Sequence, residues 1–202
     1  MSPLRNEPPP TTASRRPRRA DARRNYESLL AAATDVFTEQ GVDAPLDEIA
    51  RRAQVGNATM YRHFPTRQEL ILAVYADEVR TLCARGEQRL ADDSPGDALF
   101  EWLREFIVHV ASKRFLASAL TGERTEPPSA LFGRWHHAMH DTAAALLQRA
   151  QHAGTIRPDL EAWDLLTLAT GIALAATDTT HAHRLLTTIR YGMDVPSSPA
   201  SR

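Results

Sequence analysis

The segment Asn57–Phe64 (NATMYRHF) places hydroxyl, amide, imidazole and guanidinium groups close together. This set of groups is suited to binding a nucleic acid. Hydroxyl groups can reach phosphates or base edges, and a guanidinium can make a forked contact to guanine or phosphate. Phe64 is expected instead to pack against the first helix of the chain. The residues predicted to contact DNA are Asn57, Thr59, Tyr61, Arg62 and His63 in this segment, and Arg67 just beyond it.

A second group of residues could be considered as metal ligands, but its spacing does not match a known metal motif: His136, His137, His140 and Asp141. His136 and His140 are four residues apart and share one helix face, but position 137 is histidine where the HExxH motif has glutamate. Cys83 is the single cysteine and is expected to be a small buried apolar residue of a protein in a reducing cytoplasm. We therefore predict no metal and no cofactor. A metal or redox sensor using His136 and His140, or Cys83, remains the alternative.

Catalysis has little support in this sequence of 202 residues with a net charge of −1. No Ser/His/Asp set, P-loop, GxGxxG motif or pair of carboxylates is arranged for chemistry, so we predict that the chain is not an enzyme. No apolar run is long enough for a membrane span, and the Pro/Arg-rich start lacks the apolar stretch of a secretory signal. A cytoplasmic location is expected. A helical enzyme or binding module without a DNA role is the alternative from another class.

The elements that must position these groups all have helical periodicity, which predicts an all-α protein. A short helix begins near Pro45, Gln54–Gly56 form a tight turn, and a second helix runs from Asn57 until Pro65 ends it. Thr66, with Glu69 three residues later, predicts the start of a long helix. Further helices are predicted at 96–113, 129–152, 161–176 and 179–191, with a loop at 121–128.

The stretch LDEIARRAQVGNATMYRHFPTRQELILAVYADEV resembles the TetR family of repressors in both sequence and position. The later stretches WLREFIVHVASKRFLASAL and GTIRPDLEAWDLLTLATGIALA look like the C-terminal domain of an actinobacterial subgroup. The sequence departs from the family pattern at three positions: Gln54 replaces a turn glycine, Pro45 a hydroxyl residue and Gly56 a capping serine. A left-handed Gln54 would cost about 1 kcal/mol.

The resemblance implies an N-terminal three-helix helix-turn-helix domain followed by a helical bundle for ligand binding and dimerisation. We expect a disordered basic arm at 1–20, the DNA-binding domain at 21–68, the effector and dimerisation domain at 69–194 and a disordered tail at 195–202. The implied function is a homodimeric, ligand-responsive regulator, in the first instance a repressor. It would bind a palindromic double-stranded DNA operator, and an unknown small-molecule effector would release it.

The same resemblance implies two further sets of functional residues in the C-terminal part, one for the effector pocket and one for the dimer. Large or polar-tipped side chains are the candidates to line the effector pocket, although aromatic residues at helical spacing are more often plain core: Trp102, Phe106, His109, Phe115, Trp135 and Met139. The last two helices are expected to pair with their copies in a dimer, the alternative being the core of a monomer: Leu165, Leu168, Ile172, Leu185, Leu186 and Ile189.

Overall fold

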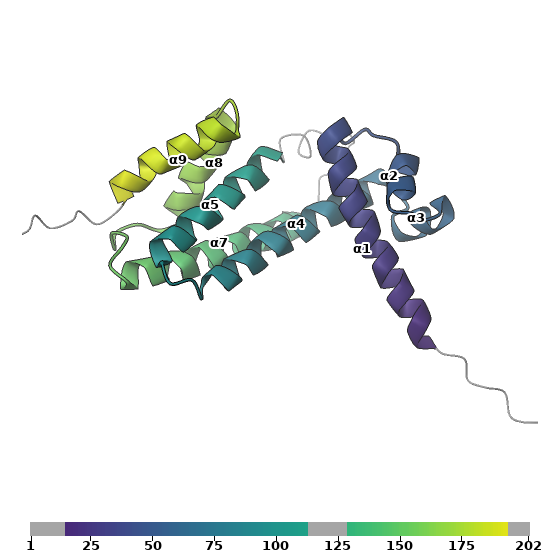
Figure 1. Ribbon diagram of the computed structural model, residues 1–202, viewed down its shortest axis with the longest axis horizontal. Helices are drawn as coiled ribbons and strands as arrows, with labels where there is room; N and C mark the ends of the chain where they lie inside the picture. Colours follow the sequence, from purple (N-terminus) through teal and green to yellow (C-terminus); the bar gives the residue numbers. More distant parts are fainter. Residues whose placement is uncertain (1–14, 113–128, 194–202) are drawn as a thin grey trace, which may run out of the picture.

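The computed structural model describes residues 15–112 and 129–193, and within these ranges the chain forms α-helices and no β-strand (Figure 1). This confirms the predicted all-α class. The helices are α1 (Arg15–Gln40), α2 (Leu46–Arg52), α3 (Asn57–His63), α4 (Arg67–Arg89), α5 (Pro95–Ser112), α7 (Ser129–His152), α8 (Ala162–Ala175) and α9 (Thr179–Met193).

Helix α1 begins earlier than the sequence predicted. The expected disordered arm at 1–20 ends too late, because the helix already includes residues from Arg15 onward. Pro17 is tolerated there, since the first backbone N–H groups of a helix have no partner in it. The neighbouring arginines and alanine have high helix propensity. The rest of the arm, the tail at 195–202 and the loop predicted at 121–128 lie outside the described residues.

Two hydrophobic cores share the long helix α4. The first joins α1, α2 and α3 to the start of α4, where Leu70 and Val74 are buried against Met60 and its neighbours. The second begins at Ile71 and extends through α5, α7, α8 and α9. In Figure 1, α4 runs from the three-helix group into the bundle formed by the later helices. A displacement of α4 would therefore be felt in both cores.

The start of α4 is fixed by the capping box that the sequence predicted. The Glu69 backbone N–H donates to the Thr66 hydroxyl at 3.2 Å, and the Thr66 N–H donates to the Glu69 carboxylate at 3.4 Å. Together they satisfy two backbone donors that a helix start otherwise leaves unpaired. Pro65 lies immediately before this cap, so α3 and α4 cannot merge into one helix.

Helices α4, α5 and α7 meet closely at Gly86. The Trp102 indole N–H of α5 donates to the Leu82 carbonyl of α4 at 3.0 Å, which holds the ring beside the glycine. A Cβ atom at position 86 would lie 2.8 Å from the Trp102 Nε1 and 2.2 Å from the Thr142 Cγ2. Only glycine lets the three helices approach this closely without a shift in packing.

We expect Gly86→Ala to lower the free energy of unfolding by about 1–3 kcal/mol, because the added methyl group overpacks the contact with Trp102 and Thr142. Urea denaturation followed by circular dichroism measures this change. Gly133→Ala is the matched control, since no described atom lies within 4 Å of its Cβ position. It should be neutral or stabilising by up to about 1 kcal/mol. Equal stability of the Gly86→Ala protein and the natural chain would contradict the close approach.

Candidate nucleic-acid interface and ligand pocket

Helices α2 and α3 form a helix-turn-helix whose inner side is packed on α1. Ile49 and Met60 are fully buried, and Phe64 contacts the Tyr26 ring of α1 at 5.2 Å between centroids. The packing predicted for Phe64 is confirmed. Gln54 has φ of 56°, so the turn does use a left-handed residue, as expected where the family has glycine. Gly56 is the N-cap of α3, without a side-chain cap.

The outer face of α3 presents the side chains that the sequence singled out. Asn57 and Arg62 are exposed, Tyr61 is 47% exposed, and Thr59 is partly buried at the edge of this face. Tyr61 lies four residues after Asn57 on the same side of the helix, and Arg62 adjoins them further round, so the three share one broad exposed face. This face can meet a flat or grooved partner without any rearrangement of the core.

Arg62 differs in its pairing from the other arginines of this region. On α2, Arg51 donates to Glu48 at 2.8 Å, and Arg52 bridges Glu48 and Glu39 of α1. Hydrogen bonds from Arg51 and Arg52 lower the pKa of Glu48 to about 2. Among the described residues Arg62 forms no ion pair. Its guanidinium is therefore a free cation on the exposed face of α3.

Two of the predicted contact residues have structural partners within the domain. The His63 ring lies against Tyr26 at 6.0 Å and Phe64 at 6.3 Å, so much of it faces α1. The Arg67 Nη1 donates to the carbonyls of Val42 and Ala44, each at 2.6 Å. Arg67 therefore braces the α1–α2 connection, where two carbonyls need donors, and its contact with a phosphate stays a prediction. Its remaining N–H groups stay available for other partners.

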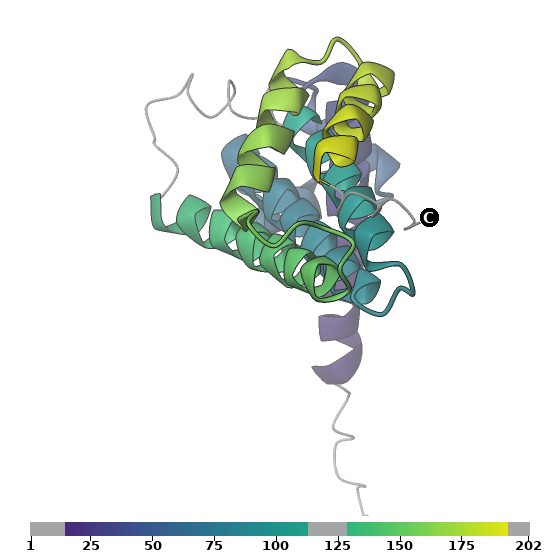
Figure 2. The same cartoon turned by 90° about the vertical axis from the view of Figure 1, so that its left-hand side faces the viewer.

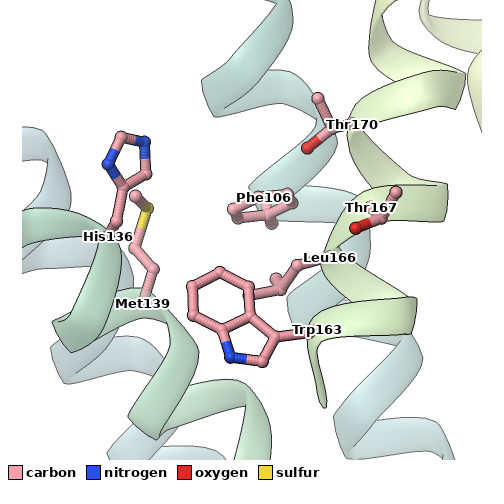
Figure 3. Close-up of a pocket in the computed structure, with 7 residues that line it drawn as sticks. All are labelled: Phe106, His136, Met139, Trp163, Leu166, Thr167 and Thr170. Atoms are coloured by element: carbon pink, nitrogen blue, oxygen red, sulfur yellow. The ribbon is translucent and has the colours of Figure 1, made fainter. Parts of the chain in front are cut away.

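A pocket of about 210 Å³ lies between α5, α7 and α8 (Figure 3). Its walls are mainly apolar, with two hydroxyl groups from α8 and one imidazole from α7, the mixture typical of sites for small organic molecules. The lining residues are Phe106, His136, Met139, Trp163, Leu166, Thr167 and Thr170. Figure 3 shows the α7 side chains facing those of α8 across the opening, with Phe106 between them.

Of the residues predicted to line an effector site, the structure brings Phe106 and Met139 to this pocket. Trp102 belongs to the core beside Gly86, and Trp135 packs on the Tyr75 ring at 4.7 Å. Phe115 lies outside the described residues. The sequence does not reveal the contribution of α8 to the pocket, because the family resemblance implies that this whole helix pairs in the dimer. Trp163 was the available signal, as a bulky aromatic in an apolar helix that turns out to be half exposed.

His109 is buried on the next turn of α5 after Phe106. Its ring lies 5.4 Å from that of Tyr75, and its Nδ1 is 3.8 Å from the Glu78 carboxylate, both on α4. Burial lowers the pKa of His109 to about 4. A separation of 3.8 Å is too long for a strong hydrogen bond, so the carboxylate does not offset the loss of hydration. The imidazole is therefore neutral at pH 7.

We expect the pKa of His109 to make the fold sensitive to mild acid. The unfolded chain takes up this proton near pH 6.5 and the folded chain only near pH 4, so stability falls as the pH drops between these values. The loss at pH 4 is about 3 kcal/mol relative to pH 7. Urea unfolding of the natural chain and of His109→Gln across this range tests the effect. Identical pH dependence in the two proteins would exclude His109 as its source.

The predicted dimer residues separate into two groups. Leu165, Ile172 and Leu186 are buried inside the chain's own core, so their assignment to a subunit interface is corrected. They face α5, because α8 and α9 each cover that helix with one side. Leu185 and Ile189 are partly buried against the same core. Leu168 is 43% exposed and is the most open of the six to a partner, and the pairing of Leu168, Leu185 and Ile189 stays a prediction.

The outward side of α8 carries further apolar and small residues that the sequence did not identify as a face. Leu174 is exposed like Leu168, and Gly171 and Ala175 lie between and beside them. Figure 2 shows α8 and α9 next to each other, on the side of the molecule turned away from α2 and α3. We call the residues Leu168, Gly171, Leu174 and Ala175 the outer face of α8.

The residues considered for metal or redox chemistry have other surroundings. His140 stacks on Trp163 at 4.4 Å, and no group of three or more potential metal ligands lies together in the described ranges. Burial raises the pKa of Cys83, which lowers the fraction of reactive thiolate. Within residues 15–112 and 129–193, no helix is long and apolar enough to cross a bilayer.

Two family models match this chain. Residues 29–74 match "Bacterial regulatory proteins, tetR family", and residues 94–195 match "Transcriptional regulator SbtR-like, C-terminal domain". The first covers the helix-turn-helix and the start of α4, and the second covers the helices around the pocket and the outer face of α8. The first match covers the residues of the first hydrophobic core, and the second match covers most residues of the second core.

Individual proteins similar to this chain include transcriptional regulators and a receptor protein. The HTH-type transcriptional activator FasR of Mycolicibacterium smegmatis is 38% identical over 87 residues, which is 43% of this chain and 40% of that protein. The A-factor receptor protein of Streptomyces griseus is 26% identical over 147 residues, 71% of this chain and 50% of that protein. The chain thus spans half or less of these two relatives. A crystal structure of a TetR transcriptional regulator from Streptomyces coelicolor superimposes with a TM-score of 0.74 at 36% identity, over 85% of this chain and 99% of that one.

Proposed function

This chain belongs to the TetR family of transcriptional regulators, and from that premise we propose that it binds a palindromic DNA operator as a homodimer. In this proposal α3 enters the major groove, and a small molecule in the pocket between α5, α7 and α8 releases the DNA. The observation that carries the DNA-binding role is the free guanidinium of Arg62 on the exposed face of α3.

The chemistry of α3 supports contact with both bases and backbone. A helix lying in the major groove presents its exposed side chains to base edges that distinguish all four base pairs. Arg62 offers paired donors for guanine, and the Tyr61 hydroxyl and Asn57 amide offer shorter-range contacts to bases or phosphates. With Arg51 and Arg52 held by acidic partners, Arg62 is the cation of α2 and α3 that is free for phosphate or base.

A homodimer is supported by the outer face of α8. Small residues at 171 and 175 would allow two copies of the helix to approach closely, and the exposed leucines would lose contact with water. A two-fold axis would repeat the same contacts on both chains and would place two copies of α3 on one side of the duplex. Two half-sites about one helical turn apart would then be read together.

Control by a ligand requires a link between pocket and DNA, and α4 supplies it. Its first turns are part of the helix-turn-helix core, and its later turns pack against α5 and α7, which line the pocket. A ligand that binds more tightly when α4 has shifted would favour the conformation with separated α3 helices. One relative is named a receptor, which agrees with a ligand-binding C-terminal domain.

The direction of control is proposed as repression relieved by the ligand, although one relative is named an activator. Selection of bound sequences from a random DNA pool with the full-length protein tests the proposal. We expect an inverted repeat to be enriched, and the protein to bind it with a stoichiometry of two chains per site. Enrichment of a single half-site, or none, would contradict it. Transcription in vitro from a promoter carrying the repeat then distinguishes repression from activation.

A further inference from the structure

Among the described residues, His109 is the one polar or charged residue that is buried as deeply as the core. Only 7% of its side chain is exposed. Its Nε2 atom has no accessible surface and no hydrogen-bond partner. A buried polar atom left without a partner costs about 1–3 kcal/mol, and natural proteins have few of them. The position therefore needs an explanation beyond packing.

One aromatic ring lies against this imidazole, and further aromatic rings pack on that one. Tyr75 lies 5.4 Å from the His109 ring, and the Trp135 ring is 4.7 Å from Tyr75. Phe132 adds a third ring at 5.1 Å from Trp135. We call Tyr75, His109, Phe132 and Trp135 the aromatic cluster. It places flat ring surfaces beside the buried, unpartnered Nε2 atom of His109.

The aromatic cluster continues the pocket by one helical turn along the same two helices. His109 follows Phe106 by three residues on α5, and Trp135 precedes Met139 by four residues on α7. Phe106 and Met139 line the pocket. One turn of helix advances about 5.4 Å, roughly the width of one aromatic ring. A molecule in the pocket that extends along the α5–α7 seam therefore reaches His109 next.

Glu78 determines what His109 can offer to such a molecule. Its carboxylate lies 3.8 Å from Nδ1, and a negative charge on that side favours the tautomer with the proton on Nδ1. The Nε2 atom is then a hydrogen-bond acceptor. It would pair with an O–H donor, whereas a ketone or carboxylate offers only acceptors. A charged ammonium would have to lose its hydration among aromatic rings.

We infer that His109 is the specificity-determining acceptor of the effector site and that the effector is an apolar, ring-sized molecule bearing a hydroxyl group. The ring would lie between α5 and α7, and its hydroxyl would donate to Nε2. This inference names the ligand class of the pocket in the proposed function and rests on that function. It also explains why the Nε2 atom of one buried imidazole is kept without a partner.

The test compares 2-naphthol with 2-methylnaphthalene, which has the same ring system but no donor, by isothermal titration calorimetry on the full-length protein. The natural chain should bind 2-naphthol at least about tenfold more tightly, since a site built to bond a hydroxyl rejects the analogue without it. His109→Phe should reduce this preference to less than about threefold. His109→Gln, which retains an acceptor, should keep most of it. His152→Phe, at an exposed position of α7, should change nothing.

The outcomes separate this inference from the proposed function. An undiminished preference in His109→Phe, or failure of the natural chain to bind 2-naphthol, would overturn the inference. Binding of 2-methylnaphthalene by His109→Phe shows that the variant is folded, and His109→Gln tests the acceptor even if it is not. Operator affinity with and without 2-naphthol is measured separately by fluorescence anisotropy. If the preference for 2-naphthol depends on His109 but 2-naphthol leaves operator affinity unchanged, the inference is upheld and ligand-controlled release is refuted.

Discussion

Replacing Arg62 with alanine should weaken operator binding by about 30-fold or more. A bidentate arginine–guanine contact is worth about 1–3 kcal/mol, and a symmetric dimer loses two of them. The side chain is exposed and forms no ion pair within the described residues, so the fold should be unaffected. Fluorescence anisotropy with the selected operator, at one fixed salt concentration, measures the change.

The same experiment shows which kind of contact Arg62 makes. If it reads a base, discrimination at one position of each half-site is relaxed, whereas loss of a phosphate contact weakens all sequences alike and reduces the salt dependence. Arg157→Ala is the matched control, because it removes the same charge from the α7–α8 connection, far from α3. An unchanged affinity in Arg62→Ala, or an equal loss in Arg157→Ala, would contradict the assignment of α3 as the recognition helix.

Introducing a carboxylate on the outer face of α8 should separate the dimer and abolish tight operator binding. In Leu168→Glu the two-fold axis would bring two copies of the new charge into one interface, where burial of an unpaired carboxylate costs several kcal/mol. Size-exclusion chromatography with light scattering should report the mass of one chain. Operator affinity should fall by about 100-fold or more, because a single subunit reads only one half-site.

Val108→Glu provides the control for this prediction. Val108 is an apolar residue of α5 with 47% exposure, close to the 43% of Leu168, but it is not on the outer face of α8. The Val108→Glu protein should remain dimeric and bind the operator normally. A dimeric Leu168→Glu protein, or a natural chain that is monomeric at micromolar concentration, would show that this face does not pair the subunits.

The helix boundaries were predictable because each depends on residues within one or two turns. Gly41 has φ of 83° and follows the end of α1, Pro65 separates α3 from α4, and Thr66 with Glu69 forms the predicted cap. Gln54 adopts the left-handed conformation that the turn requires even without glycine. In each case the backbone geometry is imposed by sterics or by a hydrogen bond between near neighbours. The same local signals located α3 and its exposed polar residues.

The sequence could not decide which side of α8 faces inward. With apolar residues on nearly every side, periodicity does not define a buried face, so Leu165 and Ile172 were assigned to the dimer although they lie in the core. For the same reason, the pocket residues Trp163 and Thr167 were missed. Their role depends on α5 and α7 packing beside them.

The sequence by itself therefore determined the all-α class, the helix-turn-helix and the exposed residues of α3. Tertiary structure alone decided that Arg67 braces the α1–α2 connection, that His109 is buried beside Tyr75, and that α8 helps to form the pocket. The physical reason is the range of the interactions involved. Caps, turns and helix periodicity act over about four residues, whereas a buried partner or a cavity wall comes from helices that are distant in the chain.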